Sequence, residues 1–172
     1  ENVKEVTDVY TMEWLNEADA KQFTEALGEI FEKSPWVAIE AAAARPFSSK
    51  QALYDYMTDV VKKSDINCQL ELLNKHPSLG ERVQMSDYST NEQQQAGLHG
   101  LNEEEYENFI QANEAYVKKF GFPFIMAVRG KNKHEIYEAM LNRLAHDCDE
   151  EFQTALTQVY QIAKFRVEER II

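Results

Sequence analysis

Helix-breaking residues are scarce in this chain, and that scarcity constrains the fold more than any other feature. Only 6 Gly and 4 Pro occur among 172 residues, and nearly every stretch between them repeats apolar residues at helical spacing. One such stripe, with i, i+3, i+4, i+7, i+8 spacing, comprises Phe23, Ala26, Leu27, Ile30 and Phe31. No two segments look able to pair as strands. We therefore predict an all-α fold, as one compact domain over residues 1–172 with about eight or nine helices.

The pattern also places the individual helices and their breaks. Helices that begin near Thr11, near Ser48 or Ser49, and near Ser89 would have a capping side chain at their start, and another helix should begin near Asn102. The segment from Gly121 to Val128 is apolar but has no helical period. Helices are expected at about 12–16, 23–31, 35–44, 49–61, 65–76, from 89, 102–120, 133–146 and 149–172.

Charge and composition exclude several classes of function. The net charge of −12 argues against nucleic acid and anionic membranes, because both are bound by basic surfaces. It leaves room for a small anionic ligand, which needs only one or two local cations. No apolar run approaches the roughly 20 residues that span a bilayer, and the first residues do not resemble a secretory signal.

Cysteine and histidine spacing points away from metal chemistry. Cys68 and Cys148 form no CxxC pair, and the four histidines form no HxxxH or HExxH motif. We therefore expect no metal. Reduced cysteines are typical of a cytoplasmic protein, and the sequence Arg170-Ile171-Ile172 is not a peroxisomal address.

His76 stands at an unusual position. The stripe of Ile66, Leu70 and Leu73 reaches His76 after three more residues, which predicts an imidazole facing the core. Pro77 pushes the preceding residue out of the α region, so the helix should end near His76. Such a histidine could simply satisfy the last helical carbonyls. It could also be a general acid or base, because histidine titrates nearest neutral pH.

The stretch Ser89-Thr90-Asn91-Glu92-Gln93 has the Ser-x-x-Glu spacing of a capping box, in which Ser89 and Glu92 satisfy each other's backbone amides. The helix that it begins is poorly amphipathic. A helix N-terminus with hydroxyl and amide side chains is also suited to an anionic or carbonyl-rich ligand. Both readings stay open, and they are compatible if only some of these side chains cap.

Two further positions break the apolar pattern. Arg166 continues the stripe of the last helix, so its guanidinium must reach solvent, pair with a carboxylate or meet an anionic ligand. The backbone groups between Phe122 and Val128 have no helix to satisfy them, so they must find other partners if buried. They could pair with neighbouring loops, or they could line a pocket and bind an amide-rich ligand. Asn113 is expected to be a buried structural amide.

Taken together these motifs resemble the family of OHCU (2-oxo-4-hydroxy-4-carboxy-5-ureidoimidazoline) decarboxylases. The resemblance covers essentially the whole chain, with the motifs in the family's order and spacing. Arg45-Pro46-Phe47 also matches. The strings that carry it are His76-Pro77-x-Leu79-Gly80, Ser89-x-x-Glu92-Gln93-x-x-Ala96-Gly97-Leu98, Asn113-x-x-Tyr116-x-x-x-Phe120-Gly121-Phe122-Pro123-Phe124-Ile125, and Arg166.

The resemblance implies an all-α enzyme of urate degradation that converts OHCU to (S)-allantoin without a cofactor. By this resemblance His76 and Glu92 are the catalytic pair. It further implies a homodimer and a fused or co-acting urate oxidase. A non-catalytic helical interaction module, or another small-molecule lyase, remains the alternative. The residues expected to contact substrate are Pro77, Ser89, Thr90, Asn91, Gln93, Phe124, Ile125, Met126, Ala127, Val128 and Arg166.

Overall fold

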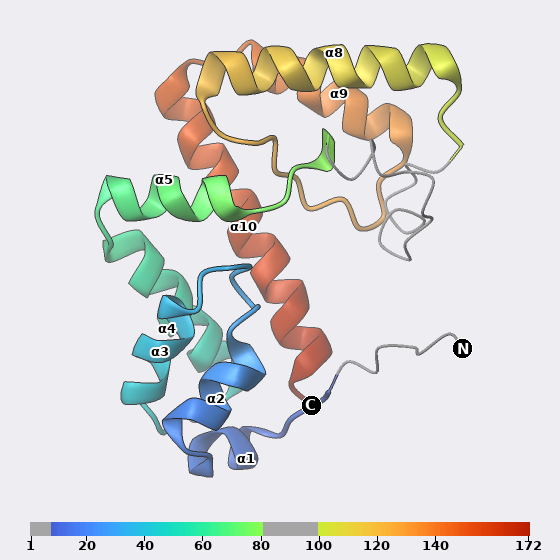
Figure 1. Ribbon diagram of the computed structural model, residues 1–172. Coiled ribbons are helices and arrows are strands. Elements are labelled where there is room, and N and C mark those ends of the chain that lie inside the picture. The colour runs from blue at the N-terminus through green and yellow to red at the C-terminus, as the bar shows by residue number, and fades with distance from the viewer. Residues whose placement is uncertain (1–7, 81–99) are drawn as a thin grey trace. The chain divides into compact units, whose positions relative to one another are not determined.

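The computed structural model describes residues 8–80 and 100–172 of the chain (Figure 1). Within these ranges the chain forms eight α-helices and no β-strand, which confirms the predicted all-α class. The helix expected from Ser89 lies outside the described residues. The helices are α1 (Met12–Glu17), α2 (Ala20–Leu27), α3 (Trp36–Ala43), α4 (Lys50–Lys63), α5 (Ile66–Lys75), α8 (Glu103–Phe120), α9 (Lys133–Leu144) and α10 (Cys148–Arg170).

The helices begin and end where local side chains satisfy their free backbone groups. The Thr11 hydroxyl accepts from the Trp14 amide at 3.1 Å and the Ser49 hydroxyl from the Ala52 amide at 3.1 Å, as predicted. Asn102 caps α8 in a capping box. Gly121 ends α8 with a left-handed φ of 77°, a conformation in which a side chain would be strained.

The described residues belong to two compact units. The first comprises Glu1–Lys75 and Tyr160–Ile172, and the second comprises His76–Val159. Helix α10 contributes residues to both. The prediction of a single domain over 1–172 stays a prediction. None of the helices in the described part is long and apolar enough to cross a membrane.

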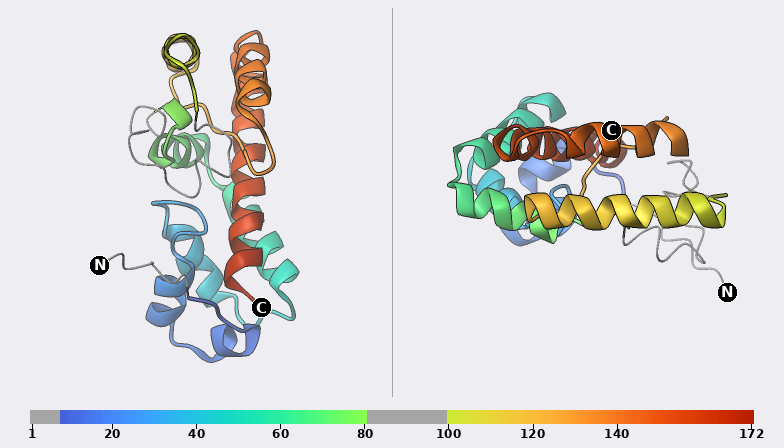
Figure 2. Two further views of the ribbon diagram at one scale, coloured as in Figure 1. Left: turned by 90° about the vertical axis from the view of Figure 1, so that its right-hand side faces the viewer. Right: turned by 90° about the horizontal axis from the view of Figure 1, so that it is seen from above.

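In the first unit α3 packs against both α2 and α4 (Figures 1 and 2). Its small residues allow this close packing, since Ala38, Ala41 and Ala42 are all buried. The stripe predicted around α2 is confirmed as core. A parallel bridge joins Tyr10 to Ile171. The buried apolar residues from α2 to the turn after it are Phe23, Ala26, Leu27, Ile30 and Phe31.

The predicted inner face of α5 is wrong at Ile66 and Leu70, although Leu73 and His76 are buried as predicted. Ile66 and Leu70 were expected to face the core, but they are 66% and 38% exposed. The buried side instead runs through Leu72 and Leu73, with Gln69 beside them. Gln69 turns inward because its amide donates to the carbonyls of Val61 (3.0 Å), Lys62 (3.4 Å) and Ser64 (3.3 Å) at the end of α4. Those orphan carbonyls attract a polar side chain to a face that the apolar pattern assigned to solvent.

In the second unit α8 lies beside α9 (Figures 1 and 2). The non-helical segment after α8 is held by an aromatic cluster around the fully buried Tyr116, whose ring lies 5.2 Å from that of Phe124 in an edge-on arrangement. This aromatic packing fixes the position of the segment relative to α8. The members of the cluster are Tyr116, Phe120, Phe122, Phe124 and Phe152.

Candidate active site

His76 follows directly on the last residue of α5 and is 6% exposed, as its inward-facing prediction required. Its Nδ1 atom lies 3.2 Å from the carbonyl oxygen of Pro77. When Nδ1 carries the proton it donates to that carbonyl, and Nε2 is then the basic nitrogen. Nε2 is itself shielded from solvent. The imidazole is thus buried, and the Pro77 carbonyl favours the tautomer that carries its proton on Nδ1.

The segment after His76 packs closely against α8 at Gly80. A Cβ atom on Gly80 would stand only 2.1 Å from Nδ2 and 2.4 Å from Cγ of Asn113, so a side chain at position 80 would require the Asn113 amide to move. The Oδ1 atom of Asn113 is buried and has no hydrogen-bond partner among residues 8–80 and 100–172. Asn113 packs against Gly80, but its side chain as a whole is only partly buried, so the expected burial of this amide is confirmed only in part.

Part of the backbone of the non-helical segment finds partners, as predicted: the Val128 carbonyl accepts from the Lys131 amide at 2.9 Å, and two other groups bind side chains. The carbonyl of Ile125 accepts from Arg143 at 2.6 Å, and the amide of Ala127 donates to Oε1 of Gln158 at 2.9 Å. Phe124 and Ile125 are buried, whereas Met126, Ala127 and Val128 are partly exposed. The segment thus has an anchored inner end and an accessible outer end.

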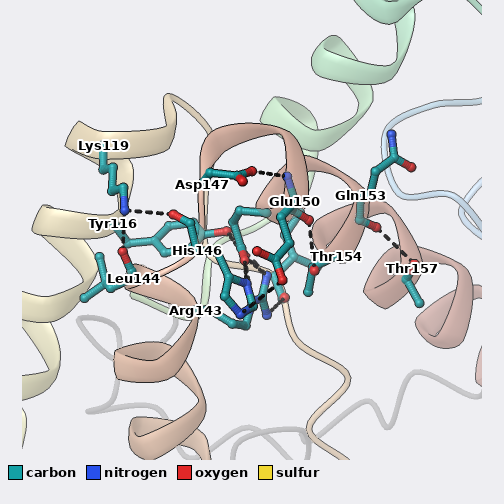
Figure 3. A network of polar contacts seen from close by, with 12 residues as sticks. Tyr116, Lys119, Arg143, Leu144, His146, Asp147, Glu150, Gln153, Thr154 and Thr157 are labelled. Carbon is teal, nitrogen blue, oxygen red and sulfur yellow. Dashed lines mark hydrogen bonds and ion pairs between the residues drawn. The ribbon is translucent and has the colours of Figure 1, made fainter.

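A buried ion pair lies beside this segment. Arg143 (7% exposed) donates through Nε to Oε1 of the fully buried Glu151 at 2.6 Å, and its second nitrogen lies 2.5 Å from the same oxygen. Tyr116 donates to Oε1 of Glu151 at 2.5 Å, and Nδ1 of His146 lies 3.0 Å from Oε2. Figure 3 shows Tyr116 of α8 meeting Arg143 of α9 and His146 of the turn that follows α9.

This network was missed in the sequence. The available signal was that Arg143 continues the Ile136 and Met140 stripe of α9, so a charge was due to fall on a buried face. Its partner Glu151 lies on the next helix, α10. The periodicity within one helix does not predict which residues of another helix it will contact. The pKa of the Tyr116 hydroxyl is raised above its usual value, mainly because the group is buried and also because it donates a hydrogen bond to Glu151. Tyr116 therefore remains a protonated donor to the carboxylate.

Arg166 belongs to the first unit and pairs there with a carboxylate, one of the three outcomes expected for it. Its guanidinium lies 2.7 Å from Oε2 of Glu32 and donates to the carbonyl of Glu29 at 3.0 Å. His76, Pro77 and the Phe124–Val128 segment belong to the second unit. Glu92 and the other predicted residues from Ser89 to Gln93 lie outside the described residues, so their contact with His76 stays a prediction.

The fold and the buried histidine at a proline break agree with one family. A sequence model described as OHCU decarboxylase matches residues 16–168, and the chain belongs to this family. It is 46% identical over 159 residues to the 2-oxo-4-hydroxy-4-carboxy-5-ureidoimidazoline decarboxylase of Halalkalicoccus jeotgali, covering 92% of this chain and 90% of that one.

Two further similar proteins are longer than this chain. The chain is 50% identical over 159 residues to the uric acid degradation bifunctional protein PucL of Bacillus subtilis, and it spans only 32% of that relative's length. A solved structure described as the crystal structure of (S)-allantoin synthase superposes with a TM-score of 0.78 at 32% identity, covering 94% of this chain and 54% of that one. The family thus occurs both as a separate protein and as part of a longer one.

Proposed function

We propose that this chain decarboxylates OHCU to (S)-allantoin, acting as one domain over residues 1–172. The observation that carries the proposal is the family match over residues 16–168 together with the buried His76 at the helix end where the family motif begins. His76 acts as the general acid or base, and Glu92 orients it or stabilises its charged form.

The chemistry needs a proton-handling group and no external electron sink. In OHCU one ring carbon carries both a carboxylate and a hydroxyl, next to a ring C=N. When the carbon–carboxylate bond breaks and CO2 leaves, its electron pair moves to form a C=C bond, and the C=N electrons move to nitrogen. That nitrogen takes up one proton. The neighbouring carbon takes another on one face while the hydroxyl loses its proton and becomes a carbonyl, so the reaction consumes one proton in total. An imidazole held on one side of the ring can perform the proton transfer that determines the configuration of the product.

The remaining predicted residues bind the substrate in this proposal. Arg166 pairs with a carboxylate or imide oxygen through its planar fork, and its pairing with Glu32 supports a fixed orientation of that fork. The exposed end of the Phe124–Val128 segment offers backbone groups to the ureido and ring amides. Pro77 and the residues Ser89, Thr90, Asn91 and Gln93 complete the contacts by family resemblance.

The activity is tested by adding the purified protein to freshly generated OHCU and following circular dichroism. We expect the circular dichroism signal of (S)-allantoin to appear at an initial rate that is proportional to protein concentration. Decay without an enzyme protonates either face, so it yields no chiral excess. Heat-denatured protein is the control. A protein that leaves both the rate and the chirality of OHCU decay unchanged contradicts the proposal and leaves a non-catalytic interaction module.

We further propose a cytoplasmic homodimer that works alongside a urate-oxidising activity, fused or separate. The family resemblance supports the dimer, and the name of the Bacillus subtilis relative supports a linked step of uric acid degradation. Light scattering during size-exclusion chromatography should give a mass of about twice the 19.9 kDa of the chain. A mass equal to one chain at micromolar concentration would rule out the dimer.

A further inference from the structure

We infer that Arg143 and Gln158 are positioning residues for the substrate, because they fix the two peptide groups on either side of the Met126 Cα atom. This inference rests on the proposed function, in which the Phe124–Val128 backbone contacts OHCU. It adds two residues to which the family resemblance gave no role. Neither side chain is proposed to touch the substrate.

The geometry of a trans peptide carries the argument. In such a group the C=O and the following N–H point in opposite directions. The only cis bond in the described residues precedes Pro46. Arg143 holds the Ile125 carbonyl at 2.6 Å, so the Met126 N–H in the same peptide points away from Arg143. Gln158 holds the Ala127 N–H at 2.9 Å, so the Met126 carbonyl points away from Gln158.

Two anchors therefore fix the directions of one donor and one acceptor on the same residue. Met126 is partly exposed, and within residues 8–80 and 100–172 no hydrogen bond reaches its N–H or its carbonyl. A donor next to an acceptor is complementary to an amide or ureido edge, which presents a carbonyl beside an N–H. OHCU has several such edges. The Met126 backbone is thus the pair whose orientation Arg143 and Gln158 determine.

The two anchors differ in rigidity. Arg143 is immobilised by the buried Glu151 and lies 4.4 Å from the centre of the Phe124 ring, so its charged donor has little freedom. Gln158 is partly buried and supplies one neutral hydrogen bond. Charge-assisted hydrogen bonds are roughly twice as strong as neutral ones. We therefore expect the larger kinetic effect from Arg143.

Loss of either anchor should loosen the substrate relative to the proton donor. Protonation would then reach both faces of the reacting carbon more evenly. A misplacement of this kind lowers kcat/KM and also lowers the enantiomeric excess of the product. Simple loss of folded protein leaves KM unchanged. It also leaves product chirality unchanged once the protein concentration is raised until the catalysed rate equals that of wild type, so that spontaneous decay contributes equally. The enantiomeric excess therefore separates a positioning role from a merely structural one.

The test compares Gln158→Leu and Arg143→Lys with wild-type protein in the OHCU assay, at a temperature where circular dichroism shows each to be folded. We expect kcat/KM to fall about 3- to 10-fold for Gln158→Leu, the worth of one neutral hydrogen bond. The fall for Arg143→Lys should be at least about 10-fold, because an ammonium lacks the planar fork. Both variants should show reduced enantiomeric excess.

Matched controls come from the same elements. Gln158→Glu keeps an oxygen that accepts from Ala127 and should restore most of the product chirality. Gln153→Leu makes the same change on an exposed face of α10. Lys119→Met removes hydrogen bonds of 2.6 and 2.8 Å to the carbonyls of Leu144 and His146, beside Arg143 but away from the segment. Gln153→Leu and Lys119→Met should stay within about twofold of wild type in kcat/KM, below the worth of one hydrogen bond.

Wild-type KM and wild-type enantiomeric excess in Gln158→Leu would overturn the inference, even if Arg143→Lys proved unable to fold. The same would hold if Gln153→Leu lowered the enantiomeric excess as much as Gln158→Leu. An inactive wild-type protein is a different outcome, because it would overturn the proposed function and the inference with it. An active wild type with unaffected variants would overturn the inference alone.

Discussion

Replacing His76 by alanine is expected to slow OHCU decarboxylation by at least about 100-fold, the usual size of a general acid–base contribution. The imidazole is the group proposed to move the proton, and no other described histidine lies in the motif at the end of α5. The helix should still end there, because Pro77 and not His76 breaks it. The rate is measured by circular dichroism at saturating OHCU, with the far-ultraviolet spectrum recorded on the same sample.

The matched control is His134→Ala, which removes an exposed histidine from the first turn of α9. It should leave the rate within about twofold of wild type, since surface substitutions remote from a site rarely matter. A His76→Ala variant that is folded and reacts at the wild-type rate would contradict the acid–base role. It would leave the family assignment untouched.

The second large effect is on stability. Replacing Glu151 by leucine should lower the free energy of unfolding by about 3–5 kcal/mol, because it leaves the Arg143 guanidinium buried without its carboxylate. Arginine cannot escape this penalty by losing its proton. Tyr116 and His146 also lose their acceptor. Urea unfolding at pH 7, followed by circular dichroism, measures the change.

The double variant Arg143→Leu/Glu151→Leu tests the cause. Removing both charges removes the unpaired cation, so this variant should be more stable than Glu151→Leu alone. Asp59→Asn serves as the control, because it breaks the exposed 2.7 Å pair with Lys63 and should change stability little. A double variant less stable than Glu151→Leu would show that the loss comes from packing and not from the unpaired charge.

Local signals were enough to predict most of the fold. Thr11, Ser49 and Asn102 cap helices because their side chains reach amides three residues ahead, an interaction within one short stretch of sequence. The face of α5 could not be predicted in the same way. It is decided by Gln69, whose amide binds carbonyls at the end of another helix. The spacing of apolar residues does not show that a polar side chain is needed to bind these carbonyls.

The candidate site shows the same division. The position of His76 at a proline break follows from neighbouring residues, and the need of the Phe122–Val128 backbone for partners follows from its lack of helical period. The partners themselves, Arg143 and Gln158, are 18 and 31 residues away from the groups that they bind. Which helix supplies them depends on tertiary packing. The roles of His76 and Glu92 came from family resemblance, not from spacing.

The contact between Gly80 and Asn113 limits how this protein can vary. The two positions share one small volume, in which the amide of Asn113 occupies the space that any side chain at position 80 would need. A larger residue at position 80 therefore requires either that the Asn113 side chain rotates away or that position 113 carries a smaller residue, so the two positions are coupled. A library that randomises position 80 alone would sample mostly variants that must displace the Asn113 amide, whereas a library that randomises both positions would also contain pairs that fit the shared space.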